Sequence, residues 1–310
     1  MSAARPTLKV AAAQYPVGRP SSLDAWADGI TRWVAEAAEA GAELLVFPEY
    51  GALELASTFG PEMEADLAGQ IRAVGSLIGQ VDALHVDLAR RHGVHILAAS
   101  LPVLAADLGG MAVNRARLIG PQGGIGIQDK RIMTPWERET WGITGNSAAR
   151  VFDTELGRIG VAICYDGEFP LIVRAMVAAG AELILIPSAT ETIAGAARVR
   201  TAALARALEN QVPVITSPTI GEAPWSPALD MNHGSAGVFV PADIGLPPTG
   251  ILAEGTFDRP GWVQAEIDFA PIAAVRESGG VRGRRDWLEQ VGAAEADAAA
   301  AAGVEIVRIA

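Results

Sequence analysis

Short apolar runs alternate with longer stretches of helical spacing along most of the chain, and the two patterns predict strands and helices in turn. Strands are expected at 7–14, 43–47, 94–103, 111–118, 125–130, 158–163, 182–187, 212–217, 235–240, 251–253 and 262–267. Helices are expected at 23–40, 61–91, 169–179 and 199–210, with Ser22 as an N-cap, a break near Gly75 or Gly79, and Gly93 as an end. Pro135 and the mixed residues around it predict a loop at 134–146.

Alternating strands and helices indicate an α/β fold, and the adjacent strand pairs indicate some antiparallel pairing, so the sheets should be mixed. Two sheets packed face to face with helices outside would suit such apolar strands, although periodicity alone does not separate this from one doubly wound sheet. No linker or repeat interrupts the pattern, so 1–310 is expected to form a single domain. The alanine-rich tail, roughly 283–310, is expected to lie at a subunit interface or to be solvated and frayed.

Composition narrows the classes of partner. The 310 residues carry a net charge of -12, which opposes binding to nucleic acid or to anionic membranes. No apolar stretch reaches the length of a membrane helix, one cysteine cannot form an internal disulfide, and the N-terminus lacks a signal-peptide pattern. We therefore expect a cytoplasmic protein with no membrane or nucleic-acid partner. His85, His92 and His95 lack a further ligand at zinc-site spacing, so no metal is expected there.

Glu49, Lys130 and Cys164 each come just after the end of an apolar strand run. Ligand sites of α/β sheets lie at the carboxyl ends of strands, so we expect these three side chains to meet in one pocket. A thiol that attacks an amide carbonyl needs a base for its proton, a positive group or N–H donors for the oxyanion, and an acid for the leaving amine. Glutamate, lysine and cysteine supply these roles, although a free cysteine is in general more often a small buried hydrophobe.

The segments around these residues resemble the motifs of the nitrilase, or carbon-nitrogen hydrolase, superfamily. The matching segments are Phe47-Pro48-Glu49-Tyr50, Asp129-Lys130-Arg131, and Ile163-Cys164-Tyr165-Asp166 with Phe169-Pro170. Glu137, ahead of Trp141-Gly142, lies where the family has a second glutamate, and Arg206-Ala207-Leu208-Glu209-Asn210 resembles its later helix motif. The resemblance covers roughly 8–268.

The resemblance implies a four-layer αββα sandwich that usually pairs into a homodimer or larger homo-oligomer and needs no metal or organic cofactor. Glu49 would be the general base, Cys164 the nucleophile, and Lys130 with the Tyr165 backbone N–H would hold the oxyanion. Glu137 would hydrogen-bond near the substrate and support the site. Contacts with a small amide-type substrate are expected from Tyr50, Trp136, Tyr165 and Thr190, with packing of the loop as the equal alternative for Trp136.

The residues after the nucleophile bear on the substrate. Family members that act on nitriles tend to show Cys-Trp-Glu, whereas Cys164-Tyr165-Asp166 resembles the amidase and carbamoyl-hydrolase branches. Leu171 stands where many relatives have a glutamate, which weakens assignment to a subfamily. The sequence thus predicts a hydrolase of a non-peptide C–N bond in an amide or N-carbamoyl compound. The alternatives are a nitrilase, an acyltransferase that passes the acyl group to an amine, and a binding protein without activity.

Overall fold

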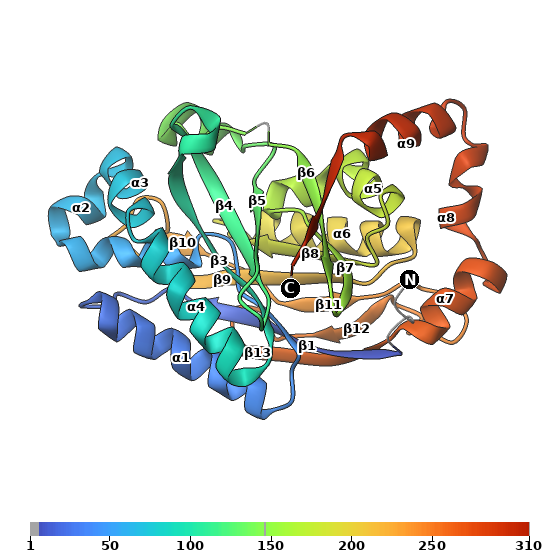
Figure 1. The fold of residues 1–310 in the computed structure, drawn as a ribbon, viewed down its shortest axis with the longest axis horizontal. Coiled ribbons are helices and arrows are strands. Elements are labelled where there is room, and N and C mark those ends of the chain that lie inside the picture. Colours follow the sequence, from blue (N-terminus) through green and yellow to red (C-terminus); the bar gives the residue numbers. More distant parts are fainter. Residues whose placement is uncertain (1–5, 146, 310) are drawn as a thin grey trace.

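The computed structural model describes residues 6–145 and 147–309, which form two β-sheets packed face to face with helices on both outer sides (Figure 1). The first sheet has the order β13 (Gly261–Asp268), β1 (Thr7–Pro16), β2 (Leu44–Val46), β3 (His95–Ala105), β4 (Met111–Ile119) and β5 (Ile125–Asp129). The second has the order β14 (Val304–Arg308), β6 (Ala149–Thr154), β7 (Gly157–Val161), β8 (Leu183–Ser188), β9 (Val214–Glu222), β11 (Gly237–Phe239) and β12 (Ile251–Glu254), with β10 (Met231–Asn232) also on β9. Both sheets mix parallel and antiparallel pairs, and they join where Tyr15 of β1 pairs with Thr219 of β9. The four-layer αββα prediction is confirmed.

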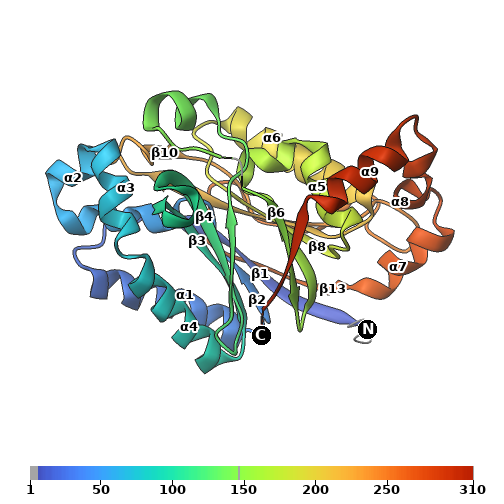
Figure 2. The ribbon, with the colours of Figure 1, turned by 45° about the horizontal axis from the view of Figure 1, so that its top comes forward.

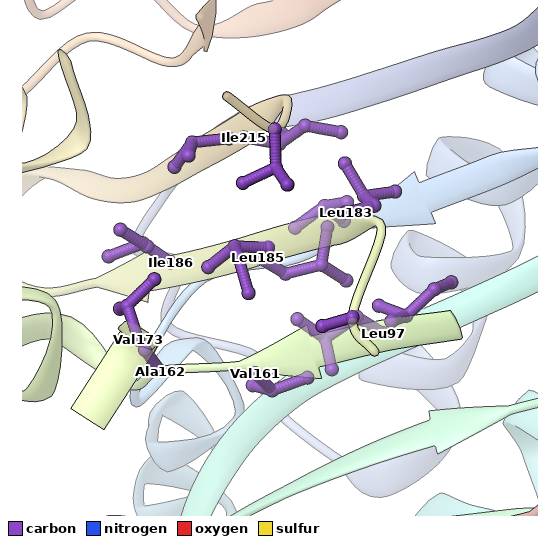
Figure 3. Close-up of a cluster of buried hydrophobic side chains, with 14 of the residues drawn as sticks. Leu97, Val161, Ala162, Val173, Leu183, Leu185, Ile186 and Ile215 are labelled. Atoms are coloured by element: carbon purple, nitrogen blue, oxygen red, sulfur yellow. The ribbon is translucent and has the colours of Figure 1, made fainter. Parts of the chain in front are cut away.

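Apolar side chains of the two sheets share one core. Leu97 of the first sheet belongs to the same buried cluster as Val161, Leu185 and Ile215 of the second, and Val173 reaches this cluster from an outer helix (Figure 3). Complete burial of side chains of this size stabilises the fold by about 1.5–3 kcal/mol each. The continuous apolar runs in the sequence are therefore explained, because these strands are covered on both faces.

Helices cover the two outer faces (Figures 1 and 2). The helices on the first sheet are α1 (Leu23–Glu39) and α4 (Ile78–His92), with α2 (Pro61–Ala65) and α3 (Leu67–Gly75) at its end. The second sheet carries α5 (Pro170–Ala178) and α6 (Ile193–Asn210). Ser22 caps α1 by accepting a hydrogen bond from the Ala25 backbone N–H at 3.1 Å, and Gly93 ends α4 in the left-handed region at φ 67°.

The structure differs from the sequence prediction at the loop after β5 and at the start of α6, among other places. The expected loop at 134–146 contains a single π-helical turn, Glu137–Trp141, because the Thr134 hydroxyl accepts the Glu137 backbone N–H and the Trp141 indole donates to the Leu67 carbonyl. Helix α6 begins at Ile193, six residues earlier than predicted, because Thr192 caps the Gly195 N–H at 3.0 Å.

The C-terminal residues fold back onto the chain itself. After α7 (Phe269–Ser278) come α8 (Gly283–Asp286) and α9 (Ala293–Ala302), and β14 then adds to the second sheet beside β6. Arg174 of α5 forms an ion pair with Asp297 of α9, which holds this segment against α5. Within the described residues, no helix is both long and apolar enough to cross a membrane.

Candidate active site

Three strands bring Glu49, Lys130 and Cys164 to the same region of the molecule. Glu49 follows β2, Lys130 follows β5, and Cys164 follows β7, each within three residues of the end of its strand. Strand β3 is parallel to β2, β4 is antiparallel to β3, and β5 is antiparallel to β4. Strand β5 therefore runs in the same direction as β2. Each of the three residues is at most 5% exposed. The structure thus brings the three segments together at the carboxyl ends of their strands, as the sequence predicts.

The Lys130 ammonium lies between two carboxylates. Its Nζ is 2.7 Å from Glu49 Oε1 and 2.7 Å from Glu137 Oε2. All three side chains are buried, so these are charge-assisted hydrogen bonds in a low-dielectric setting, where the interaction is stronger than at the surface. Two carboxylates and one ammonium leave the group with one surplus negative charge when all are ionised.

Two further donors fix the Glu49 carboxylate. The Asn114 side chain donates to Oε1 at 2.9 Å, and the Ala189 backbone N–H donates to Oε2 at 2.8 Å. Asn114 comes from β4 and Ala189 from the residue after β8, so both sheets take part in holding one carboxylate. Glu49 therefore has a fixed orientation.

Cys164 begins the short 3-10 turn Cys164–Glu168 that joins β7 to α5. Its φ of 50° puts a residue with a Cβ in the left-handed region, a conformation that costs energy and occurs at functional sites. The Sγ lies 3.7 Å from the Ala189 carbonyl oxygen, while the N–H of the same Ala189 binds Glu49. The thiol and the carboxylate are thus positioned by one residue of the loop after β8.

Glu137 is fixed by the π-helical turn and by Tyr50. The Tyr50 hydroxyl donates to Oε1 at 2.7 Å, and both the N–H and the hydroxyl of Thr134 donate to Oε2 at 2.9 Å. Tyr50 also has a positive φ of 54°, and its N–H donates to the Ser100 hydroxyl. These contacts make Glu137 an orienting partner of Lys130.

Asp166 connects the segment that carries the cysteine to the segment that carries the lysine. Its carboxylate accepts hydrogen bonds from the backbone N–H groups of Ile132 at 2.8 Å and Arg131 at 3.0 Å. These two residues directly follow Lys130 in the chain. Burial raises the pKa of Asp166 to about 6. Asp166 therefore sets the distance between the two segments through two backbone donors.

The pKa values of the central groups are shifted in ways that suit proton transfer. Burial raises the pKa of Glu49 to about 7 against the pull of Lys130, and burial together with Glu49 raises the pKa of the Cys164 thiol well above its usual value. Burial alone would lower the pKa of Lys130, but the two carboxylates hold it well above the usual range. Burial alone would raise the pKa of Glu137, but the charge of Lys130 and its hydrogen bond outweigh burial, so the pKa of Glu137 is lowered. At neutral pH the thiol keeps its proton while Glu49 titrates beside it, so Glu49 is the group able to accept that proton.

The four residues predicted to contact substrate differ in their exposure and in the partners of their side chains. Tyr50 is buried and its hydroxyl is bound to Glu137, whereas Trp136 is 39% exposed and its ring packs against Trp141. Tyr165 is half-buried, and its ring packs edge-on against Phe169. Its backbone N–H is next to the nucleophile because Tyr165 directly follows Cys164 in the chain. Thr190 is buried and donates its hydroxyl to the His233 carbonyl at 2.6 Å.

Asn114 was not predicted as a site residue, and Asp166 was predicted only as part of the nucleophile motif, with no role of its own. A signal for Asn114 was present, because it is a polar residue inside the apolar run of β4 and is fully buried. Nothing local in the sequence marked Ala189, which acts through its backbone.

Known proteins resemble this chain over most of its length. The family model described as carbon-nitrogen hydrolase matches residues 9–277. A probable hydrolase, YhcX of Bacillus subtilis, is 32% identical over 279 residues, 90% of this chain, and the chain spans 53% of its length. Omega-amidase NIT2-B of Xenopus laevis is 27% identical over 267 residues, which are 83% of this chain and 88% of that protein.

A solved structure of a carbon-nitrogen hydrolase from Helicobacter pylori superposes with a TM-score of 0.70 at 21% identity, covering 88% of this chain and 93% of the other. At that identity the likeness supports the fold alone, whereas the family match extends over most of the chain and includes every residue of the centre described above. The chain therefore belongs to the carbon-nitrogen hydrolase family.

Proposed function

We propose that this enzyme hydrolyses a small amide through a thioester on Cys164, with Glu49 as general base and Lys130 as the positive group for the oxyanion. The observation that carries the proposal is the Glu49–Lys130–Glu137 ion cluster beside the only cysteine of the chain. Glu49 has a pKa of about 7 and the thiol a raised pKa, so the resting site holds the proton on sulfur and a base next to it.

The first half of the reaction forms a C–S bond and breaks a C–N bond. Sulfur attacks the amide carbonyl carbon while Glu49 takes the thiol proton. The oxyanion that develops is held by Lys130 and by the Tyr165 backbone N–H. When the tetrahedral intermediate collapses, Glu49 returns the proton to the leaving nitrogen, and ammonia or an amine departs from a thioester.

The second half breaks the C–S bond. Glu49, ionised again, takes a proton from water, whose oxygen attacks the thioester carbon. Collapse expels the sulfur, which regains the proton from Glu49, and the carboxylic acid leaves. Glu137 remains ionised throughout and keeps Lys130 charged and oriented.

Amides are favoured over nitriles on the residues after the nucleophile. Tyr165 and Asp166 are the pair that resembles the amidase and carbamoyl-hydrolase branches, and Asp166 here accepts two backbone N–H groups of the lysine segment. At 27% identity an omega-amidase matches 83% of the chain and a plant nitrilase matches 80% of it, so the choice between amide and nitrile rests on the residues after the nucleophile. An N-carbamoyl compound offers the same type of carbonyl and belongs to the same substrate class.

The test is an ammonia-release screen over aliphatic amides, ω-amides of dicarboxylic acids, N-carbamoyl compounds and nitriles, with Cys164→Ala as the matched inactive variant. We expect release from at least one carbonyl substrate by the wild-type enzyme and none by the variant. Release from nitriles alone would overturn the amide assignment, and turnover by Cys164→Ala would overturn the nucleophile.

We also propose that 1–310 is one domain and that the enzyme works as a homodimer or larger homo-oligomer. Support for one domain comes from β14, which places 304–308 in the same sheet as β7 and β8. Light scattering coupled to size-exclusion chromatography measures the assembly, and a mass of 32.2 kDa in solution would contradict the oligomer.

A further inference from the structure

The proposed base Glu49 and the proposed nucleophile Cys164 are both contacted by the backbone of Ala189. The Ala189 N–H donates to Glu49 Oε2 at 2.8 Å, and the Ala189 carbonyl oxygen lies 3.7 Å from Cys164 Sγ. Ala189 directly follows β8, and α6 begins at Ile193. The placement of both reacting groups therefore depends on what holds the short segment 189–192.

Thr190, the next residue of this segment, is bound at two points to His233. The Thr190 hydroxyl donates to the His233 carbonyl at 2.6 Å, and the His233 backbone N–H donates to the Thr190 carbonyl at 2.8 Å. His233 lies in the loop between β10 and β11. Two hydrogen bonds of opposite direction fix both the distance and the orientation of the two residues, because each bond is directional. A displacement of His233 should therefore move Thr190 with it.

His233 is held in turn by Asp258, which lies in the loop between β12 and β13. One carboxylate oxygen of Asp258 is 2.7 Å from His233 Nδ1, and the other accepts the Gly234 backbone N–H at 2.8 Å. Because an ionised carboxylate only accepts hydrogen bonds, Nδ1 is the donor. The His233 ring also stacks on Phe257, with a centroid distance of 6.2 Å and an interplanar angle of 9°. The ring is thus fixed at one edge and on one face.

The loop that carries Asp258 is itself fixed at several points. Asp258 has a φ of 55°, a left-handed conformation that a residue with a Cβ keeps only where its surroundings hold it. Its backbone N–H donates to the Gly234 carbonyl at 2.9 Å. The Gln14 side chain of β1 donates to the Thr256 carbonyl at 2.8 Å and accepts the Ala236 N–H at 3.0 Å. Strand β1 therefore anchors both loops that meet at His233.

We propose that His233 and Asp258 are positioning residues of the active site, which set the place of Ala189 between the base and the nucleophile. The inference rests on the proposed roles of Glu49 and Cys164. Hydrogen bonds connect Asp258 to His233 and His233 to Thr190, and the peptide bond connects Thr190 to Ala189. His233 and Asp258 thus act on the reacting groups through Ala189.

The expected consequence is a change in the pKa of Glu49. A backbone N–H that donates to a carboxylate stabilises its ionised form and so lowers its pKa. The charged and titratable groups that face Glu49 are Lys130, Glu137 and Cys164, and they remain in place when His233 or Asp258 is truncated. Glu49 then loses or weakens one donor at constant burial, so its pKa should rise above about 7.

The experiment follows the alkylation of Cys164, the only cysteine, by iodoacetamide as a function of pH, with the adduct measured by intact mass. It needs no amide substrate. In the wild-type enzyme the rate should rise as the pH passes about 7, because Glu49 must be ionised to take the thiol proton when sulfur displaces iodide. In Asp258→Ala and His233→Ala the midpoint should move up by about one pH unit, as expected for a weakened hydrogen bond to a charged group. A merely structural role would lower the Tm and leave the midpoint in place.

Two further variants separate positioning from other effects. His233→Asn keeps an N–H donor near the place of Nδ1 but has no titrating ring, so it should return the midpoint most of the way to the wild-type value. The matched control is Asp243→Ala, because the Asp243 carboxylate also accepts two backbone N–H groups, from Ile244 at 2.6 Å and Gly280 at 2.9 Å. Asp243 follows β11, whereas His233 precedes it, so this variant should keep the wild-type midpoint. Circular dichroism checks that each variant is folded.

The outcomes distinguish this inference from the proposed function. A wild-type rate that does not change across pH 7 would overturn the role of Glu49 and this inference with it. A rise near pH 7 in the wild-type enzyme, with an unmoved midpoint in both Asp258→Ala and His233→Ala, would overturn the positioning role alone. So would an equal shift in Asp243→Ala, or equal shifts in His233→Asn and His233→Ala.

Discussion

Replacing Glu137 by glutamine removes one of the two carboxylates that share Lys130. Glu137 raises the pKa of Glu49 by its charge, so its neutralisation should let Lys130 lower that pKa. The two contacts of 2.7 Å to Nζ place the nearer oxygens of the two carboxylates at most about 5.4 Å apart. Two unit charges at that separation interact by about 3 kcal/mol at an effective dielectric constant of 20, which corresponds to about two pH units.

The assay is the pH dependence of kcat/KM, which reports the pKa values of the free enzyme. The wild-type enzyme should lose activity as the pH falls through about 7, because Glu49 must be ionised to accept the thiol proton. In Glu137→Gln the acidic limb should move down by one to two pH units, since the base then stays ionised at lower pH. The maximal rate should fall as well, because the oxygen that accepts from Lys130 and Thr134 is no longer a carboxylate.

Glu139→Gln serves as the matched control, because Glu139 lies in the same π-helical turn but is exposed. Its charge is screened by solvent, so the acidic limb should stay at the wild-type position. An unshifted limb in Glu137→Gln, or a shift to higher pH, would refute the proposed coupling between the two carboxylates.

Two further perturbations separate catalysis from stability. Tyr50→Phe removes the hydrogen bond to Glu137, and Tyr15→Phe removes a similar one to buried Glu54. Each variant should lower the free energy of unfolding, measured by urea titration, by about 1–3 kcal/mol. Only Tyr50→Phe should also lower kcat, and equal kcat values would show that the Tyr50 contact is purely structural. Gly145→Ala should reduce both activity and Tm, because a Cβ would lie 2.1 Å from the Arg131 carbonyl oxygen; an unchanged Tm in a thermal melt would contradict this close approach.

Much of the fold could be predicted because it depends on local patterns. Apolar runs marked β1, β3, β4 and β8, and cap residues such as Ser22 and Gly93 marked the helix ends. The N-terminus of α6 was missed although Thr192 is a good cap, because Gly195 and three alanines in the first two turns weaken the apolar periodicity. Strand β14 was missed because it is short and its side chains are mostly exposed, so its position comes from pairing with β6.

The centre of the site could be predicted only in part, for a related reason. Glu49, Lys130 and Cys164 follow strands, so their meeting at one sheet edge follows from the topology of α/β sheets. Asn114 and Ala189 complete the binding of Glu49 through contacts between residues 65 and 140 positions apart. Such contacts depend on how the two sheets pack, which no local pattern records.

The most direct test of the proposed mechanism is intact-mass analysis of the enzyme, acid-quenched during turnover of an amide identified in the ammonia-release screen. Cys164 is the only cysteine, so a thioester appears as a single acyl adduct on the peptide that contains it. We expect this adduct in the wild-type enzyme and its absence in Cys164→Ala. Ammonia release by Cys164→Ala, or an acyl adduct on any other residue, would contradict the account.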